Sequence, residues 1–480
     1  MSILGHQAAA VSAEQLATAL AAMKQAHLAE GAASLELRRD RLDRAIALLL
    51  ENREAIVAAV SADFGNRSRE QTLLSDIAGS VASLKHCREH LAEWMQAESH
   101  QAPFPGCEAR VDYQPLGVVG VISPWNFPIV LAFGPLASIL AAGNRAMLKP
   151  SELTPRTSAL LAELIARYFD ANELNTVLGS AEVGALFSAQ PFDHLIFTGG
   201  TAVGRHIMRA AAENLVPVTL ELGGKSPVLV SRSADLATVV QRVMTVKTFN
   251  AGQICLAPDY LLLPEELLGD FVTEAVRFVS EMYPTLRSNS DYTSIINPRH
   301  FDRLRGYLAD AHARGAYLVE INPAQEDLSD RETRKIAPTL VLDTSEAMQV
   351  LHEEIFGPLL PIKTYRDFSA AIDYVNQQPR PLAAYYFGED AGERQQMFER
   401  TTSGAVVIND CMSHVLFEEL PFGGVGHSGM GAYHGVYGFR TFSHAKAVVV
   451  QSPIGESNLA MRAPYGAMIH GLLDQLLTAN

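Results

Sequence analysis

Basic residues are scarce in this chain, and long apolar runs are absent. Lysine and arginine number 38 against 53 acidic residues, which gives a formal net charge of −15 at pH 7. A nucleic-acid-binding protein needs a basic surface to meet phosphate, so this balance argues against that class. No run reaches the roughly 18 apolar residues of a membrane-spanning helix, and Met1–Ala10 lacks the basic and apolar parts of an export signal. We therefore expect a cytoplasmic protein without a stable membrane anchor.

Cysteine is also scarce, with four residues: Cys87, Cys107, Cys255 and Cys411. They form no CxxC pair and no metal-ligand spacing, so no metal site is expected. A cysteine without further context is usually a buried small hydrophobe or a surface thiol. Only Cys255 lies in a segment that indicates chemistry, Phe249-Asn250-Ala251-Gly252-Gln253-Ile254-Cys255-Leu256-Ala257-Pro258-Asp259-Tyr260. A working thiol points to a reducing compartment.

The overall amino-acid composition is typical of a large, well-packed globular protein. Hydrophobic residues make up 48% of the 480 residues and charged residues 19%. A chain of this length is too long for one core, so two or three domains are expected.

The N-terminal part predicts helices between about residues 13 and 60. Apolar residues fall near one face at helical spacing, with arginines among the polar positions. The apolar set is Leu35, Leu42, Ile46 and Leu49, and the arginines are Arg38, Arg41 and Arg53. Asp63-Phe64-Gly65 then ends the helical segment with a glycine cap.

Short, wholly apolar segments separated by helices predict parallel βαβ units, because such strands are buried on both faces. The first series of strands is Val118–Ile122, Ala146–Leu148, Leu195–Phe197 and Val218–Leu220, with helices at 155–168 and 202–215. The second series is Val228–Val230, Tyr260–Leu263, Thr339–Leu342, Leu360–Tyr365 and Val406–Ile408. Val111–Gly117 is predicted to be an exposed edge strand, since Pro115 and Gly117 are unfavourable in a central one. The fold class expected is α/β, with two Rossmann-like parallel-sheet domains.

Three residues supply the parts of a covalent reaction at a carbonyl. The thiol of Cys255 can add to a carbonyl, and a carboxylate can activate the water that later releases the acyl group. Glu221 precedes Cys255 by 34 residues, in Glu221-Leu222-Gly223-Gly224-Lys225-Ser226-Pro227. Asn126, in Pro124-Trp125-Asn126-Phe127-Pro128, is a donor for the oxygen that becomes negative. Taken singly, Asn126 is an ordinary turn residue and Glu221 an ordinary helix-cap or loop carboxylate.

Together, and in this order, these motifs resemble the aldehyde dehydrogenase superfamily. The resemblance runs from about Val118 to Lys446, and the 34-residue interval equals that of the family. It implies that Cys255 is the nucleophile, Glu221 the base for thioester hydrolysis and Asn126 an oxyanion donor beside the N–H of Cys255. The glycines after Glu221 would let its carboxylate swing between the thioester and solvent. Leu420–Gly429 and Phe442–Lys446, like Ala257–Tyr260, resemble the class 3-like branch.

A glycine-bearing turn is the first expected cofactor contact. Phe197-Thr198-Gly199-Gly200-Thr201-Ala202-Val203-Gly204 follows a strand and opens a helix, where backbone N–H groups can meet a phosphate. Its spacing is not the GxGxxG fingerprint, so alone it is an ordinary strand-to-helix turn. In the family the cofactor pyrophosphate lies at the head of this helix.

The resemblance implies the remaining cofactor contacts. Lys149 and Glu152 would bind the adenosine ribose, and a carboxylate there disfavours a 2′-phosphate, so NAD is expected, with NADP as the alternative. In Glu353-Glu354-Ile355-Phe356-Gly357-Pro358, Glu354 would hold the nicotinamide ribose with Phe356 beside it. The full expected set is Ser123, Pro124, Trp125, Lys149, Glu152, Gly199, Gly200, Val203, Leu222, Gly223, Glu354 and Phe356.

The substrate is predicted from the loop before Pro421. Cys411, Met412, His414 and Phe417 are expected to line the aldehyde tunnel, and an aromatic and sulfur-rich lining suits a cinnamyl or medium-chain aldehyde. Asp63–Ser68 and Ile408–Asp410 resemble the coniferyl aldehyde dehydrogenases. Two alternatives remain, a relative that passes its thioester to coenzyme A and a non-catalytic structural relative. Glu221 argues against the first, and the retained thiol and base argue against the second.

The resemblance also implies how the chain is divided. Residues 1–102 and 118–224 would form a discontinuous NAD-binding domain, and 225–410 the catalytic domain. Bridging strands would occupy 103–117 and 440–456, pocket-lining loops 411–439 and a tail 457–480. In the tail an apolar stripe favours a docking helix over a membrane anchor. The stripe is Met468, Leu472, Leu473, Leu476 and Leu477.

Assembly is predicted from two strands outside the α/β units, Val111–Leu116 and Phe442–Gln451. An unpaired edge strand invites pairing with a second subunit. The alternative is that the two segments pair only with each other. Since the class 3-like branch tends to form dimers, we expect a homodimer with C2 symmetry.

Overall fold

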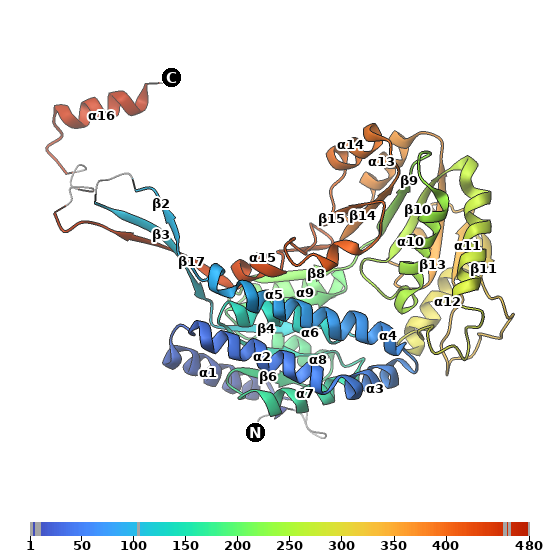
Figure 1. Cartoon of the computed structure of the whole chain (residues 1–480), viewed down its shortest axis with the longest axis horizontal. Helices are drawn as coiled ribbons and strands as arrows, with labels where there is room; N and C mark the ends of the chain where they lie inside the picture. Colours follow the sequence, from blue (N-terminus) through green and yellow to red (C-terminus); the bar gives the residue numbers. More distant parts are fainter. Residues whose placement is uncertain (1–2, 5–10, 103–105, 455–457, 459–461, 479–480) are drawn as a thin grey trace.

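The computed structural model describes residues 3–4, 11–102, 106–454, 458 and 462–478. Within these residues there are two seven-stranded sheets and one three-stranded sheet. Figure 1 shows two α/β lobes, each built around one large sheet, and a narrow arm of strands that extends away from them. The predicted fold class, α/β with two parallel-sheet domains, is confirmed.

The first large sheet has the strand order β1-β6-β5-β4-β7-β8-β16, and its neighbours are parallel except at β16. Its strands are β1 (Ile3–Leu4), β4 (Val118–Ile122), β5 (Arg145–Lys149), β6 (Leu174–Val177), β7 (His194–Gly199), β8 (Val218–Leu222) and β16 (Gly429–Met430). The helices between them are α6 (Val130–Ala141), α7 (Pro155–Tyr168), α8 (Ala181–Ser188) and α9 (Thr201–Ala212). All four strands predicted for this unit are therefore confirmed.

The second large sheet has the order β11-β12-β13-β10-β9-β14-β15, with only β11 antiparallel to its neighbour. Its strands are β9 (Ser226–Val230), β10 (Pro258–Pro264), β11 (Tyr317–Glu320), β12 (Thr339–Leu342), β13 (Leu359–Tyr365), β14 (Ala383–Phe387) and β15 (Ala405–Ile408). Its helices are α10 (Leu236–Thr248), η3 (Glu265–Leu267), α11 (Leu268–Met282), α12 (Pro298–Ala313), η4 (Gln349–Leu351), α13 (Phe368–Gln377) and α14 (Ala391–Arg400). The five strands predicted here are confirmed, and β11 and β14 were missed.

The N-terminal helices pack on the first lobe, but two of the three arginines predicted at polar positions are buried. The helices are α1 (Ala13–Glu30), α2 (Leu35–Glu51), α3 (Arg53–Phe64), α4 (Arg69–Gln71), η1 (Thr72–Ala78) and α5 (Gly79–Trp94). Arg38 and Arg41 are buried in α2, not exposed. Arg41 donates to Glu30 at 3.0 Å and to Glu173 at 3.1 Å, and this pairing offsets the cost of burying its charge.

The three-stranded sheet forms the arm and has the order β17-β3-β2. It consists of β2 (Glu98–His100), β3 (Glu108–Pro115) and β17 (Ser443–Val450). The prediction of an edge strand at Val111–Gly117 is wrong, because β3 lies between the other two. Pro115 is the last residue of β3 and lies beyond residues 109–111, so on the side of β2 its missing N–H interrupts no pairing.

The described part of the C-terminal segment, residues 462–478, lies at the far end of this arm (Figure 1). Its helix α16 (Ala467–Leu477) has no buried side chain, so the expected docking does not occur against this chain. The described helices include none that combines the length and apolar character needed to cross a membrane. The remaining short elements are η2 (Phe249–Gly252), η5 (Ser413–Leu416) and α15 (Gly435–Thr441).

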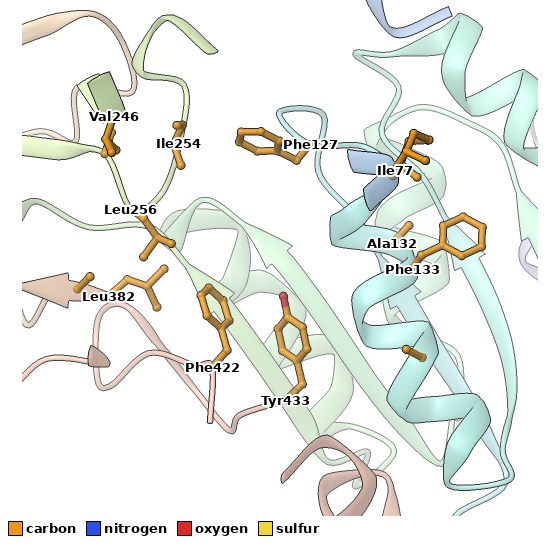
Figure 2. Packing of buried hydrophobic residues seen from close by; sticks show 14 of the residues in the cluster. Ile77, Phe127, Ala132, Phe133, Val246, Ile254, Leu256, Leu382, Phe422 and Tyr433 are labelled. Carbon is orange, nitrogen blue, oxygen red and sulfur yellow. The ribbon is translucent and has the colours of Figure 1, made fainter. Parts of the chain in front are cut away.

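One apolar core joins the two lobes. Phe127 and Phe133 from the first lobe belong to the same buried cluster as Ile254 and Leu256 from the second. Figure 2 shows Phe422, from a loop near the C-terminus, beside Tyr433 and between these two groups. Truncating a buried phenylalanine to alanine typically costs about 3–5 kcal/mol, so this shared packing fixes the lobes against each other.

Candidate active site

A cavity of about 240 Å³ brings together residues from both lobes. Asn126 follows β4, Glu221 lies in β8, and Cys255 lies between η2 and β10. In an open parallel sheet the ends of the strands are where ligands bind. Its lining consists of Pro124, Trp125, Asn126, Leu131, Thr198, Gly199, Gly200, Glu221, Leu222, Gly223, Cys255, His300, Arg303, Glu354, Phe356, Leu382 and Phe422.

Cys255 is presented by a backbone in an unusual conformation. Asn250 and Ala251 have φ values of 49° and 50°, and Gly252 has 71°, all in the left-handed region. Glycine is required at position 252 because a Cβ there would lie 2.3 Å from the carbonyl oxygen of Gly357. Cys255 itself is half-buried and forms no disulfide. Burial, followed by the charges of Glu354 and Glu221, raises the pKa of the Cys255 thiol to about 12.

Glu221 is buried, and neither oxygen of its carboxyl group has a hydrogen-bond partner in the structure. Burial raises the pKa of this carboxyl well above its usual range. Its backbone is held between Thr198 of β7 and Gly429 of β16. The glycines that follow therefore do not give Glu221 freedom of movement, and any swing must come from rotation of its side chain.

Asn126 connects the two lobes through its side-chain amide. The Nδ2 atom donates to the carbonyl oxygen of Gln253 at 3.1 Å, two residues before Cys255. An amide nitrogen carries two hydrogens, so one remains for another acceptor. The backbone carbonyl of Asn126 accepts hydrogen bonds from Arg67 at 2.6 Å and from Asn250 at 3.1 Å.

Glu354 faces the same cavity and is held by backbone contacts. It accepts from the N–H of Gly224 at 3.1 Å, and a Cβ on Gly223 would lie 2.2 Å from its carboxyl group. Burial, followed by the charge of Asp259, raises the pKa of Glu354 to about 7. Phe356, at φ 50°, packs edge-to-face on Trp125 with ring centroids 5.4 Å apart.

The remaining predicted cofactor residues occupy different positions. Gly199, Gly200 and Leu222 line the cavity, while Ser123, Lys149, Glu152 and Val203 lie outside its lining. Lys149 is buried and its Nζ pairs with the exposed carboxylate of Glu152 at 3.0 Å. Ser123 is buried with an unpartnered hydroxyl, and Val203 is exposed in the first turn of α9.

None of the four predicted substrate residues lines this cavity. Cys411 is buried in the core, Phe417 is exposed, and Met412 has a left-handed φ of 65°. His414 stacks on Phe422 with centroids 5.9 Å apart, and Phe422 does reach the cavity.

Sequence reasoning missed six residues that line the cavity. They are Leu131, Thr198, His300, Arg303, Leu382 and Phe422. His300 and Arg303 lie one turn apart on α12, and Arg303 donates to the carbonyl oxygens of Glu354 at 3.2 Å and Ile355 at 2.8 Å. Their spacing of three residues indicates that they lie on one face of a helix. No motif in the surrounding sequence, however, pointed to a role in the site. Phe422 lay inside a quoted motif and was not singled out.

The pattern of the aldehyde dehydrogenase family matches residues 3–448 of the chain. This chain belongs to the aldehyde dehydrogenase family. It is 77% identical over 480 residues to the coniferyl aldehyde dehydrogenase of a Pseudomonas species, covering 100% of both chains. It is also 55% identical to a probable coniferyl aldehyde dehydrogenase of Caulobacter vibrioides, covering 94% of each. The resemblance inferred from the ordered motifs is confirmed, and the chain is an oxidoreductase that acts on aldehydes.

Solved aldehyde dehydrogenase structures share the fold. Substrate-bound AldH of Staphylococcus aureus superposes with a TM-score of 0.90 at 34% identity, covering 96% of this chain and 99% of that one. Betaine aldehyde dehydrogenase of Staphylococcus aureus, solved in complex with NAD+, gives a TM-score of 0.84 at 27% identity, with 94% and 90% covered.

The raised pKa of Cys255 predicts slow alkylation when no cofactor is present. Because only the thiolate reacts, the rate should rise about tenfold per pH unit and show no plateau between pH 7 and 10. Glu354→Gln should raise the rate at a fixed pH, since it removes a charge that disfavours the thiolate. The measurement is iodoacetamide labelling of the Cys255 peptide by mass spectrometry. Unfolded chain is the reference, with a plateau expected above about pH 8.5. A plateau near that value in the folded protein would contradict the prediction.

Proposed function

We propose that this chain oxidises a cinnamyl-type aldehyde, such as coniferyl aldehyde, to its carboxylic acid, with NAD as the hydride acceptor. The observation that supports this most directly is that Cys255, Asn126 and Glu221 line one cavity with Glu354 and Phe356. A nucleophile, an oxyanion donor and a base therefore face the same volume, as acyl chemistry at a carbonyl requires.

The first step belongs to Cys255 and Asn126. The Sγ atom forms a bond to the aldehyde carbon, and the carbonyl oxygen takes the electron pair of the former π bond. The free hydrogen of the Asn126 amide and the N–H of Cys255 are the donors for this oxygen. Losing one such donor typically costs about 2.7–4 kcal/mol of transition-state stabilisation. With its pKa raised to about 12, the thiol needs a nearby positive charge to become a thiolate at neutral pH.

The residues of the cavity fit a nicotinamide cofactor. The first turn of α9 follows Gly200, has no side-chain cap, and leaves open space where a Cβ at Gly200 would point. Such a helix N-terminus suits a pyrophosphate. Glu354 and Phe356 would hold the nicotinamide end, and Lys149 and Glu152 the adenosine ribose. When bound, the nicotinamide ring supplies a positive charge near the thiol and accepts the hydride lost by the adduct.

Glu221 acts as the base in thioester hydrolysis. A buried carboxyl without hydrogen-bond partners has a raised pKa and is a stronger base once it is ionised. It takes a proton from water, the resulting hydroxide attacks the thioester carbon, and the bond to Sγ breaks to regenerate the Cys255 thiolate. The carboxylic acid then leaves. Because Glu221 activates water, the acyl group is released without coenzyme A. Coenzyme A is the acyl acceptor in the alternative mechanism.

The cavity wall favours an aromatic or apolar substrate. Trp125, Leu131, Leu382 and Phe422 contribute apolar side chains to the lining. Apolar walls with few polar groups are typical of sites for aromatic ligands. The relative with 77% identity carries the name coniferyl aldehyde dehydrogenase, and this similarity supports the choice of aldehyde.

Steady-state kinetics test this function. NADH formation with coniferyl aldehyde should exceed that with a short alkyl aldehyde in kcat/KM, and adding coenzyme A should not change the rate. Cys255→Ala should lower turnover below a few per cent of the parent while cofactor binding stays within a few-fold. A dependence on coenzyme A would replace the hydrolytic route with acyl transfer, and turnover by Cys255→Ala would remove the thiol from its role.

Glu221→Gln should slow thioester hydrolysis more than hydride transfer, because the base is needed only when water attacks. Rapid mixing of this variant with aldehyde and NAD should give a burst of NADH followed by a slow steady state. The parent enzyme and Cys255→Ala, which should give no burst, are the controls. If the first turnover of Glu221→Gln is slowed as much as later ones, Glu221 does not have this role.

Glu152→Gln should improve the use of NADP relative to NAD. The change removes a negative charge and frees Lys149, which now pairs with Glu152 at 3.0 Å, to meet a 2′-phosphate. The measurement is the ratio of kcat/KM for the two cofactors. Glu163→Gln on α7, an exposed carboxylate paired with Arg167, is a matched control that should leave the ratio unchanged. An unaltered ratio in Glu152→Gln would contradict the assignment.

A further inference from the structure

A buried ion pair lies behind Asn126. Arg67 donates from Nη2 to Oδ2 of Asp76 at 2.7 Å, and both side chains are fully buried. The other guanidinium nitrogen, Nη1, donates to the backbone carbonyl of Asn126 at 2.6 Å. The cation therefore connects a buried carboxylate directly to the backbone of the proposed oxyanion donor.

Asp76 fixes the other end of the same loop. It lies in η1, a π-helical stretch of seven residues, and such stretches recur at functional sites. Its Oδ1 accepts from the N–H of Ile129 at 3.0 Å and of Val130 at 3.1 Å, at the start of α6. The loop from Asn126 to Val130 is thus held at its first carbonyl by Arg67 and at its last two amides by Asp76.

The segment that carries Arg67 is itself anchored at both ends. Asp63 accepts from the N–H groups of Arg156 at 3.0 Å and Thr157 at 2.8 Å, in the first turn of α7. Asn66 donates to the carbonyl oxygen of Tyr292 at 2.9 Å. The Arg67 guanidinium also lies over the ring of Phe127, with 4.7 Å to the centroid.

This framework continues into the loop that carries Cys255. Asn250 donates from its side chain to the carbonyl oxygens of Asn126 at 3.1 Å and Gln253 at 3.2 Å. The Asn126 amide donates to that same Gln253 oxygen. A shift of the Asn126 backbone would therefore move the amide relative to the thiol.

We propose that Arg67 and Asp76 are positioning residues that hold the Asn126 amide at a fixed position relative to Cys255. The inference rests on the proposed role of Asn126 as an oxyanion donor. Stability is a poor explanation for the pair, because a buried ion pair is often no more stabilising than apolar residues of the same volume. Positioning is a better one, since a displacement of about 1 Å in a reacting group can cost roughly 100-fold in rate.

The test replaces both charges at once, because removing one partner would strand the other in the interior. Arg67→Met with Asp76→Asn leaves an amide oxygen at position 76 for Ile129 and Val130. We expect kcat/KM to fall about 10- to 100-fold, mainly through kcat, with the Kd for NAD within about threefold. Arg67→Lys, which keeps one donor and the charge, should retain more activity than the double variant.

A double-mutant cycle with Asn126→Ala separates positioning from a general loss of structure. In the Asn126→Ala background the same two substitutions should lower kcat/KM by less than about threefold, because the group that they position is gone. An equal loss in both backgrounds, or no loss with Asn126 present, would overturn the inference. If Asn126→Ala alone leaves turnover unchanged, the proposed role of Asn126 fails first, and the inference with it.

Two further measurements guard against misfolding. Arg41→Met with Glu173→Gln removes the ion pair between buried Arg41 of α2 and Glu173, neither of which lines the cavity, and should leave kcat/KM within about twofold. Circular dichroism checks that each variant is folded. If the variant at positions 67 and 76 does not fold, Arg67→Lys alone carries the same cycle, because it keeps a positive charge beside Asp76. A lysine has no second nitrogen with which to hold the carbonyl oxygen of Asn126 as well as Asp76, and equal losses in both backgrounds would again overturn the inference.

Discussion

The geometry of the site depends on one carbonyl oxygen, that of Gln253. It accepts from Asn126 at 3.1 Å and from Asn250 at 3.2 Å, so residues of both lobes converge on it. Asn126 belongs to the loop after β4 of the first sheet, whereas Gln253 precedes β10 of the second. Because the bonds are buried, each would leave an unsatisfied group if the lobes separated. The thiol therefore keeps its place relative to both sheets through short hydrogen bonds.

Burial sets the electrostatics of the same region. Glu221 and Glu354 are carboxyls whose pKa values are both raised by burial, to about 7 for Glu354. Their charges in turn oppose ionisation of Cys255, whose own burial is the larger cause of its raised pKa. With a pKa of about 12, the thiol is almost entirely protonated at neutral pH and reacts slowly unless a positive charge lies nearby.

The sequence was sufficient for most, but not all, of the strands that carry a strong apolar signal, since the apolar strand β14 was missed. β4 and β12 were predicted with the bounds that the structure gives, because strands buried on both faces read as continuous apolar runs. β6 was missed since its central residues, Asn175 and Thr176, are polar although they are buried.

Long-range partners were the part that the sequence did not reveal. From the sequence, Arg41 is expected to be a solvent-facing charge. In the fold it pairs with Glu173, which lies more than a hundred positions later in the chain. His300 and Arg303 reach the cavity only because α12 packs beside it, and no local sequence pattern predicts that packing. By contrast, Cys255, Glu221 and Asn126 were found from local motifs, and the structure gathers all three around one volume.

The edge of the first sheet has a consequence for biosynthesis. β8, which carries Glu221, pairs on its outer side with β16, formed by Gly429 and Met430 near the end of the chain. Domains generally fold from the N-terminus as they emerge from the ribosome. A nascent chain that has emerged only as far as β15 still lacks this strand and leaves the backbone of β8 open. The carboxyl group of Glu221 therefore gains its final surroundings only after residues 429 and 430 have emerged from the ribosome.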